Sequence, residues 1–231
     1  MKQNPTIAIS LSHISKKYEI HHEKPTLVEK FTKGPNETFW ALNDINLTIY
    51  KGERVGIAGP NGCGKTTLLK IIARITTPTS GSVRTYGKIV SLIDLEAGFH
   101  PDLTGEQNIY LNGMLLGMSK EEISKKMKKI IHFADIKQFI DAPLFTYSQG
   151  MKLRLGFAVA IHADPRILVM DEGFMVGDVQ FRQKCMKKIN RLFVQKKTVI
   201  MVSQMLDFLQ MYCKRIVFLE QGTVVRDKSS V

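Results

Sequence analysis

The chain has 231 residues, and its 33 Lys and Arg exceed its 21 Asp and Glu, which gives a formal net charge of +12. With 44% hydrophobic and 23% charged residues, the composition excludes a disordered or collagen-like chain, and the scattered cations select neither a nucleic acid nor an anionic membrane as partner. The three cysteines lack the spacing of a zinc finger or disulfide framework, and neither a signal peptide nor a membrane-length apolar run is predicted.

Short apolar segments of strand length recur along the whole chain. The residues that predict strands are 7–11, 45–49, 54–58, 89–92, 167–170, 199–202, 216–218 and 223–225. Helical patterns lie between several of them, at 65–75, 120–133, 149–162 and 183–194. Strands that alternate with helices predict an α/β domain with a parallel sheet at its centre.

Three regions depart from this alternation. Residues 6–58 are rich in strand patterns and poor in helix, which predicts an added antiparallel β subdomain. Residues 21–38 are polar and contain two Pro and one Gly, so we expect a long loop or insertion there. Residues 99–162 carry several helical patterns, which predicts a helical lobe.

The segment after residues 54–58 fits the pattern GxxxxGK[ST], a glycine-rich loop that opens a helix. The residues of this phosphate loop, with the threonine that follows it, are Gly59, Pro60, Asn61, Gly62, Cys63, Gly64, Lys65, Thr66 and Thr67. Glycines allow backbone N–H groups to converge on phosphate oxygens, and a helix N-terminus adds partial positive charge. Lys65 can then reach the β- and γ-phosphates of a nucleotide, and the Thr66 hydroxyl can bind Mg²⁺. A glycine turn before an ordinary helix is the alternative.

The apolar strand 167–170 ends in two carboxylates, Asp171 and Glu172. At the carboxyl end of a buried strand, Asp171 can hold Mg²⁺, directly or through water, and Glu172 can orient or deprotonate the attacking water. Taken alone, two acidic residues could equally cap the next helix. Their occurrence together with a phosphate loop favours the metal and water site.

A third motif gives a specific resemblance. Residues 147–154 read YSQGMKLR, and this segment resembles the signature motif of ATP-binding cassette (ABC) ATPases, in the form used by exporters of bacterial surface polysaccharides. The resemblance implies that Ser148, Gln149 and Gly150 serve the nucleotide bound by a second subunit, in a head-to-tail dimer with ATP between the two copies. By themselves, Ser148 and Gly150 would be an ordinary helix cap and turn.

Other segments extend the resemblance over about residues 7 to 226. Tyr18 matches the aromatic residue of the family that stacks on adenine, with a plain strand-face tyrosine as the alternative. Asp178 lies in the segment that crosses the dimer interface in the family. Residues 99–109 resemble the GFHPxLTGxxNI segment of the O-antigen and teichoic acid exporter subgroup, for which an insertion such as 21–38 is also typical.

Two positions depart from the family pattern. Where most members carry the glutamine of the Q-loop, this chain has none, and either His100 or Glu96 is the nearest candidate. Where the family places a switch histidine, this chain has Ser203 followed by Gln204. Glutamine can donate an amide N–H but cannot carry a positive charge, so we expect slower hydrolysis with ATP binding and dimerisation largely retained.

The resemblance implies a single ABC ATPase domain over residues 1–231, without the C-terminal carbohydrate-binding domain of some relatives. Its cofactors would be ATP and Mg²⁺, with Lys65, Glu172 and Gln204 as the catalytic residues. The expected partners are a second copy and an integral membrane permease, at the cytoplasmic face of the cell membrane, and no nucleic acid. The substrate moved would be a lipid-linked polysaccharide of O-antigen or teichoic acid type. The alternatives are another exported substrate, or a soluble clamp ATPase acting on nucleic acid or ribosomes.

Overall fold

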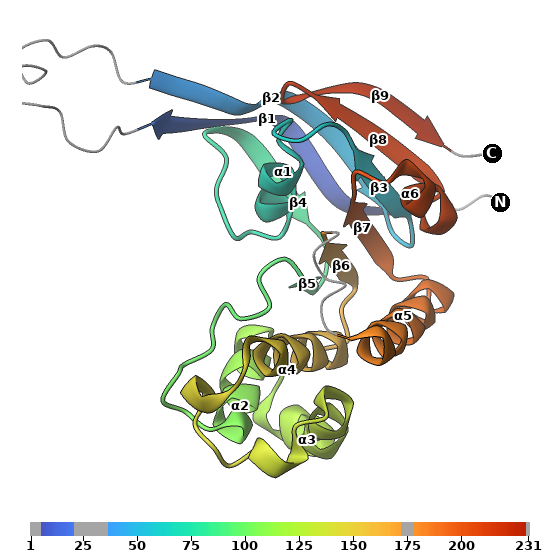
Figure 1. Cartoon of the computed structure of the whole chain (residues 1–231). Coiled ribbons are helices and arrows are strands. Elements are labelled where there is room, and N and C mark those ends of the chain that lie inside the picture. The colour runs from blue at the N-terminus through green and yellow to red at the C-terminus, as the bar shows by residue number, and fades with distance from the viewer. Residues whose placement is uncertain (1–5, 21–36, 172–177, 230–231) are drawn as a thin grey trace, which may run out of the picture.

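The computed structural model describes residues 6–20, 37–171 and 178–229 (Figure 1). It has two sheets and a group of helices, which confirms the expected α/β fold class. The predicted insertion at 21–38 lies outside the described residues except for its last two positions. Within the described residues, no helix is long and apolar enough to cross a lipid bilayer.

The central sheet has six strands in the order β5-β6-β7-β3-β8-β9, all parallel to their neighbours except the last pair. The strands are β3 (Arg54–Ala58), β5 (Ile89–Ser91), β6 (Ile167–Met170), β7 (Thr198–Val202), β8 (Arg215–Glu220) and β9 (Thr223–Ser229). Every residue of β6 and β7 is buried, as expected for strands covered on both faces. These continuous apolar runs are the reason why the sequence pattern located them.

A second, antiparallel sheet has the order β2-β1-β4. Its strands are β1 (Ile7–Ile20), β2 (Glu37–Tyr50) and β4 (Ser80–Thr85). The sequence patterns predicted only parts of β1 and β2, because their polar halves pair with each other without an apolar alternation. β4 was missed, since its sequence SGSVRT contains a single apolar residue.

Three helices pack with the sheets: α1 (Lys65–Ile72), α5 (Val179–Val194) and α6 (Leu206–Tyr212). The helix predicted over 65–75 ends at Ile72, and Arg74 adopts a positive φ of 61°. The helix predicted from 183 begins at Val179 instead, because the Asp178 side chain accepts a hydrogen bond from the backbone N–H of Phe181 and caps it.

The remaining helices lie together in the lower part of Figure 1. They are α2 (Gly105–Leu115), α3 (Lys120–Ala134) and α4 (Gln149–His162), with the 3-10 turns η1 (Lys137–Phe139) and η2 (Leu144–Thr146). Thr104, Ser119 and Ser148 cap the three α-helices through hydrogen bonds from their side-chain oxygens.

Two hydrophobic cores lie on opposite faces of the central sheet. Val169 and Ile200 belong to the core shared with α1 and the antiparallel sheet. Leu168 and Val199, one residue earlier on the same strands, belong to the core shared with the helical group. This alternation follows from the two-residue period of a strand. Both cores therefore fix the positions of β6 and β7, and with them the residues that follow the carboxyl ends of these strands.

Candidate nucleotide site

The phosphate loop connects the buried strand β3 to helix α1. Gly59, Gly62 and Gly64 have φ values of 152°, 75° and 102°, a region that residues with a Cβ rarely adopt. A Cβ on Gly59 would lie 2.1 Å from the carbonyl oxygen of Leu219, and one on Gly64 would lie 2.3 Å from that of Ala41. The glycines are therefore required by the backbone and its close neighbours, as the motif predicted.

Lys65 begins α1 and is 8% exposed. Its ammonium lies 2.7 Å from the carbonyl oxygens of Gly59 and of Pro60, to which it donates hydrogen bonds. An ammonium has three N–H donors, so one remains for a phosphate oxygen. The contacts to the loop position the charge in advance of nucleotide binding.

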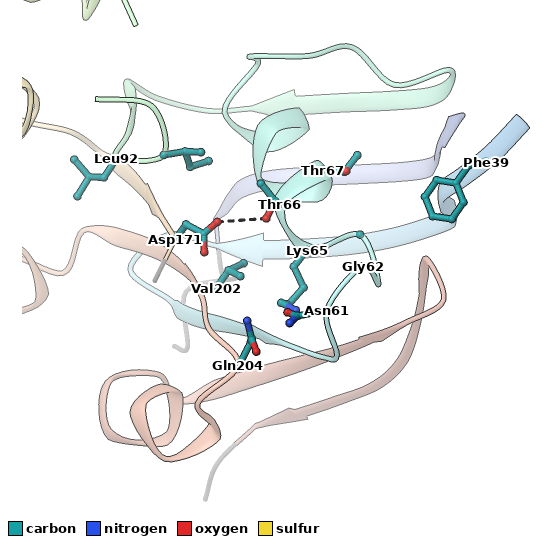
Figure 2. Close-up of a pocket in the computed structure, with 12 residues that line it drawn as sticks. Phe39, Asn61, Gly62, Lys65, Thr66, Thr67, Leu92, Asp171, Val202 and Gln204 are labelled. Atoms are coloured by element: carbon teal, nitrogen blue, oxygen red, sulfur yellow. Dashed lines mark hydrogen bonds between the residues drawn. The ribbon is translucent and has the colours of Figure 1, made fainter. Parts of the chain in front are cut away.

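Thr66 and Asp171 come together at the edge of this loop, as Figure 2 shows. The Thr66 hydroxyl donates to a carboxylate oxygen of Asp171 over 3.3 Å, although 105 residues separate the two in sequence. A hydroxyl and a carboxylate are oxygen ligands of the kind that Mg²⁺ prefers. The donor set therefore fits the magnesium ion that the sequence predicted here, while Glu172 lies outside the described residues.

A pocket of about 470 Å³ is bordered by the phosphate loop and by the residues that follow the carboxyl ends of β5, β6 and β7. Its lining includes eight residues that the sequence analysis had selected: Asn61, Gly62, Gly64, Lys65, Thr66, Thr67, Asp171 and Gln204. It also includes Phe39, Leu92, Ile93 and Val202, which were not selected. Gln204 directly follows β7 and Ser203, so the topology of the sheet places it opposite the loop (Figure 2).

Two other residues of the phosphate loop, Pro60 and Cys63, do not line this pocket. Cys63 is buried in the core below the antiparallel sheet, as expected for a small residue between glycines. Pro60 and Cys63, with the exposed aromatic residues Phe39 and Trp40, border a smaller hollow of about 220 Å³. An aromatic wall therefore adjoins the phosphate loop.

Phe39 is the functional candidate that sequence reasoning missed. It pairs directly with Tyr18 across the β1–β2 ladder, so the two rings share one face of the sheet. Phe39 lines the nucleotide pocket, whereas Tyr18, with the Lys16 ammonium 5.1 Å from its ring centre, does not. The sequence shows two adjacent aromatic residues, Phe39 and Trp40, but only the structure shows that both are exposed and that Phe39 reaches the pocket.

The predicted signature residues lie outside this pocket. Ser148 caps α4, with its hydroxyl accepting from the backbone N–H of Met151 over 3.3 Å. The Gln149 amide donates to the carboxylate of Glu96, and a Cβ on Gly150 would meet only the Ser148 hydroxyl, at 3.9 Å. These residues therefore form a helix N-terminus. They are absent from the described lining of the phosphate pocket of the same chain.

Asp178 links the start of α5 to α4. Its carboxylate caps α5 and pairs with the guanidinium of Arg154, which also lies 3.6 Å from Asp135. The hydrogen bond from the Phe181 backbone and the charge of Arg154 lower the pKa of the Asp178 carboxyl. The carboxylate is therefore ionised at neutral pH and fixed beside the helix that carries the signature residues.

The segment 99–109 packs against the signature segment. Asn108 is fully buried, and its amide donates to the carbonyl oxygens of His100, Leu103 and Thr104 over 2.9–3.0 Å. A Cβ on Gly105 would lie 2.2 Å from the hydroxyl oxygen of Tyr147. The subgroup-like segment thus has a structural role, which is to place the residues before Ser148.

Neither candidate for the Q-loop position lines the pocket. Glu96 contacts Gln149, and the backbone N–H of His100 donates to Asn108 over 2.8 Å. Leu92 and Ile93, directly after β5, border the pocket instead. The choice between His100 and Glu96 therefore stays a prediction.

A comparison with known families now identifies the chain. The profile of the ABC transporter family matches residues 42–175, more than half of the sequence, and includes the phosphate loop, the signature segment and Asp171. The chain belongs to the ABC transporter family. It is an ABC ATPase, and we refer to it below as the cassette.

Relatives and solved structures agree with this assignment. The cassette is 38% identical over 220 residues to the O-antigen export system ATP-binding protein RfbB of Klebsiella pneumoniae, covering 92% of the cassette and 89% of the relative. It is 39% identical over 221 residues to the teichoic acids export ATP-binding protein TagH of a Listeria monocytogenes strain, covering 94% of the cassette and 66% of the relative. A dimeric ATP-binding cassette in a post-hydrolysis state, bound to ADP and Pi, matches with a TM-score of 0.74 and 25% identity, over 96% of this chain and 99% of that chain.

Proposed function

We propose that the cassette is the ATP-binding and ATP-hydrolysing subunit of a system that exports a lipid-linked surface polysaccharide of O-antigen or teichoic acid type. The observation that carries this proposal is the match over more than nine tenths of the chain to ATP-binding proteins of O-antigen and teichoic acid export. The pocket geometry supports the ATPase part independently, because it joins a phosphate loop, a hydroxyl and a carboxylate of the kind that suits Mg²⁺, and Gln204.

Phosphate binding rests on the loop and on two oxygen ligands. The backbone N–H groups of residues 61–66 and the ammonium of Lys65 bind the phosphate oxygens. Thr66 and Asp171 would hold Mg²⁺, which would supply positive charge to neutralise the phosphate groups of the nucleotide. Phe39, with Tyr18 beside it, provides an aromatic face for the adenine ring.

Hydrolysis rests on the residues that follow β6 and β7. In this proposal, Glu172 orients the attacking water and accepts its proton. Gln204 donates an amide N–H toward the γ-phosphate, without the positive charge that a protonated histidine would provide. The reaction is therefore expected to be slower than with histidine at this position.

Two copies are needed for a complete site. Ser148, Gln149 and Gly150 form a helix N-terminus outside the pocket of their own chain, and a helix N-terminus favours an anion. We infer that they contact the γ-phosphate held by a second copy, with Asp178 near the same interface. ATP would then stabilise the closed dimer, and hydrolysis would release it, which moves an integral membrane permease between states. The cassette would be bound peripherally to this permease at the cytoplasmic face of the membrane.

Dimer formation can be tested directly. The Glu172→Gln variant at high concentration with ATP and Mg²⁺ should sediment as a dimer, and with ADP as a monomer. Adding Ser148→Arg should abolish the dimer and leave ATP binding to the monomer intact. A trapped sample that stays monomeric with ATP, with and without the permease, would contradict the two-copy site.

The export function requires a test in cells. Deletion of the gene should remove the polysaccharide from the cell surface and cause its lipid-linked form to accumulate inside. The unchanged cassette and a Lys128→Ala control should restore export, whereas Lys65→Ala should not. Surface polysaccharide that is unaffected by the deletion would refute the export function, and nucleic acid that co-purifies with the cassette would favour the clamp alternative.

A further inference from the structure

A second hollow lies at the opposite end of the central sheet from the nucleotide pocket. It has a volume of about 690 Å³ and is bordered by residues from 51–54, 193–196 and 214–215, and we call it the basic hollow. These segments precede or open β3, β7 and β8, whereas the nucleotide pocket lies beyond the carboxyl ends of β3, β6 and β7. Because β3 is parallel to both β7 and β8, the two hollows lie at opposite ends of shared strands.

Five cationic side chains and a single carboxylate border the basic hollow. The cations are Lys51, Arg54, Lys196, Lys214 and Arg215, and the carboxylate is Glu53. Arg215 donates to Glu53 over 3.0 Å and to both carboxylate oxygens of Asp227. Within the described part of the chain, the other four cations form no ion pair. The hollow therefore carries an excess of positive charge that the protein itself does not neutralise.

Helix ends explain two of these cations, Lys196 and Lys214. Lys196 follows the last turn of α5, where its backbone N–H donates to the carbonyl oxygen of Phe193 and its charge is favourable to the helix dipole. Lys214 likewise directly follows α6, which ends at Tyr212 with Cys213 as its C-cap, whereas Lys51 precedes β3 and follows the strand β2. Helix ends therefore do not account for the presence of Lys51 and Arg54 in the same hollow.

The hollow also has an aromatic wall. The guanidinium of Arg54 lies over the ring of Phe193, 5.2 Å from its centre, and the neighbouring Val194 is 83% exposed. A volume of about 690 Å³ is within the range of about 300–1,000 Å³ that small-molecule pockets occupy. Clustered cations beside an aromatic and aliphatic wall suit a ligand with several phosphate charges and an organic part.

We propose that the basic hollow binds an organic polyphosphate, at a site separate from the one where ATP is hydrolysed. Lys51, Lys196 and Lys214 contact the phosphate groups, and Phe193 with Arg54 contacts the organic part. This inference does not depend on the proposed export function. Its ligand could be a soluble nucleotide or the phosphorylated headgroup of a lipid.

The first experiment uses inorganic triphosphate as the probe, measured by calorimetry on the full chain with Lys65→Ala to disable the phosphate loop. The test variant adds Lys196→Glu and Lys214→Glu. The control variant adds Lys120→Glu and Lys128→Glu, which change net charge equally on an exposed face of α3. Loss of two charge-assisted contacts should raise the Kd of the test variant about tenfold or more, with little change in the control.

Two further measurements make the result decisive. A milder variant, with Lys196→Gln and Lys214→Gln, should show an intermediate Kd, and thermal unfolding should confirm that each variant is folded. GTP and vesicles that contain a lipid diphosphate then distinguish the sources, since only the true class of ligand should lose affinity with the test variant. Triphosphate that binds the test and control variants equally, or does not bind the Lys65→Ala parent, would overturn the proposal.

Discussion

Gln204 occupies a position whose backbone is fixed by its neighbours. Ser203, one residue earlier, is buried, and its hydroxyl accepts a hydrogen bond from the backbone N–H of Met205 over 3.0 Å. Strand β7 ends at Val202, and its pairing with β3 places the next residues beside the phosphate loop. The side chain at 204 can therefore be exchanged to change the chemistry with little effect on the fold.

Gln204→His should therefore change the rate of hydrolysis and leave the fold intact. A histidine would place an imidazole ring, which can carry a positive charge, beside the γ-phosphate. One contact of this kind in the transition state is worth about 2.7–4 kcal/mol, or roughly 10²–10³ in rate. We expect the turnover rate for ATP to rise by a factor that approaches this range, with the Kd for ATP unchanged. Gln204→Ala is the control and should stay slow. Equal turnover for the unchanged cassette and Gln204→His would show that position 204 does not limit hydrolysis.

Phe39 gives a second prediction at the level of one side chain. If its ring stacks on adenine, Phe39→Ala should weaken ATP binding by about 1–2 kcal/mol, roughly tenfold in Kd. Binding of inorganic triphosphate, which has no base, should not change. Tyr18→Ala is the matched variant on the opposite strand and should have the smaller effect. A larger effect of Tyr18→Ala would show that Tyr18, the residue predicted from the sequence, makes the adenine contact instead of Phe39.

Helix α2 depends on a turn that its own residue Asn108 holds in place. Four hydrogen bonds connect this fully buried side chain to the backbone of 100–104. The same turn contacts the loop before Ser148, since Leu144 donates its N–H to Leu103 and Phe145 to Pro101, both over 2.9 Å. A loss of this turn would disturb the signature residues as well as α2.

Asn108→Ala should therefore be strongly destabilising. It removes four hydrogen bonds and leaves the backbone N–H of His100 without its side-chain acceptor, and we expect the free energy of unfolding to fall by about 2–4 kcal/mol. Asn190→Ala, at an exposed position of α5, is the control and should change it by less than about 0.5 kcal/mol. Urea unfolding of both variants gives the comparison. A small effect at Asn108 would mean that water replaces its hydrogen bonds.

At the scale of the whole molecule, the helical group surrounds His162 with apolar and cationic neighbours. Its ring packs edge-on against Phe133, and burial, together with Lys126, Lys129 and Lys188, lowers the pKa of His162 from 6.5 to about 4. Burial is the larger cause. Protonation of this residue is thus more favourable in the unfolded chain than in the folded one.

The consequence is a stability that depends on pH in a defined direction. Between pH 6.5 and about pH 4, the unfolded chain binds a proton at His162 that the folded chain does not, so stability rises with pH in this window and falls on acidification. The expected loss across the window is about 2–3 kcal/mol from this residue. In urea unfolding at several pH values, His162→Gln should remove that part of the slope and His132→Gln should not. If His162→Gln leaves the slope unchanged, the pH dependence of the free energy of unfolding arises from carboxylates and not from His162.

Elements with a local signal could be predicted from the amino-acid sequence. A continuous apolar run predicted β6 and β7, because strands covered on both faces need no alternation, and the glycine pattern predicted the phosphate loop, because backbone approach and positive φ exclude side chains. The roles expected of Glu172 and of the insertion at 21–38 remain predictions, since those residues lie outside the described part of the chain.

The tertiary structure alone decided which distant residues meet. Phe39 could not be selected from its sequence, since it reaches the nucleotide pocket only because β2 pairs with β1 and passes beside the phosphate loop. Strand β4 has almost no apolar signal and exists through its pairing with β1. The basic hollow likewise gathers three separate segments at the amino ends of parallel strands. Local patterns encode conformation, but contacts between remote segments depend on strand order and register, which no short segment contains.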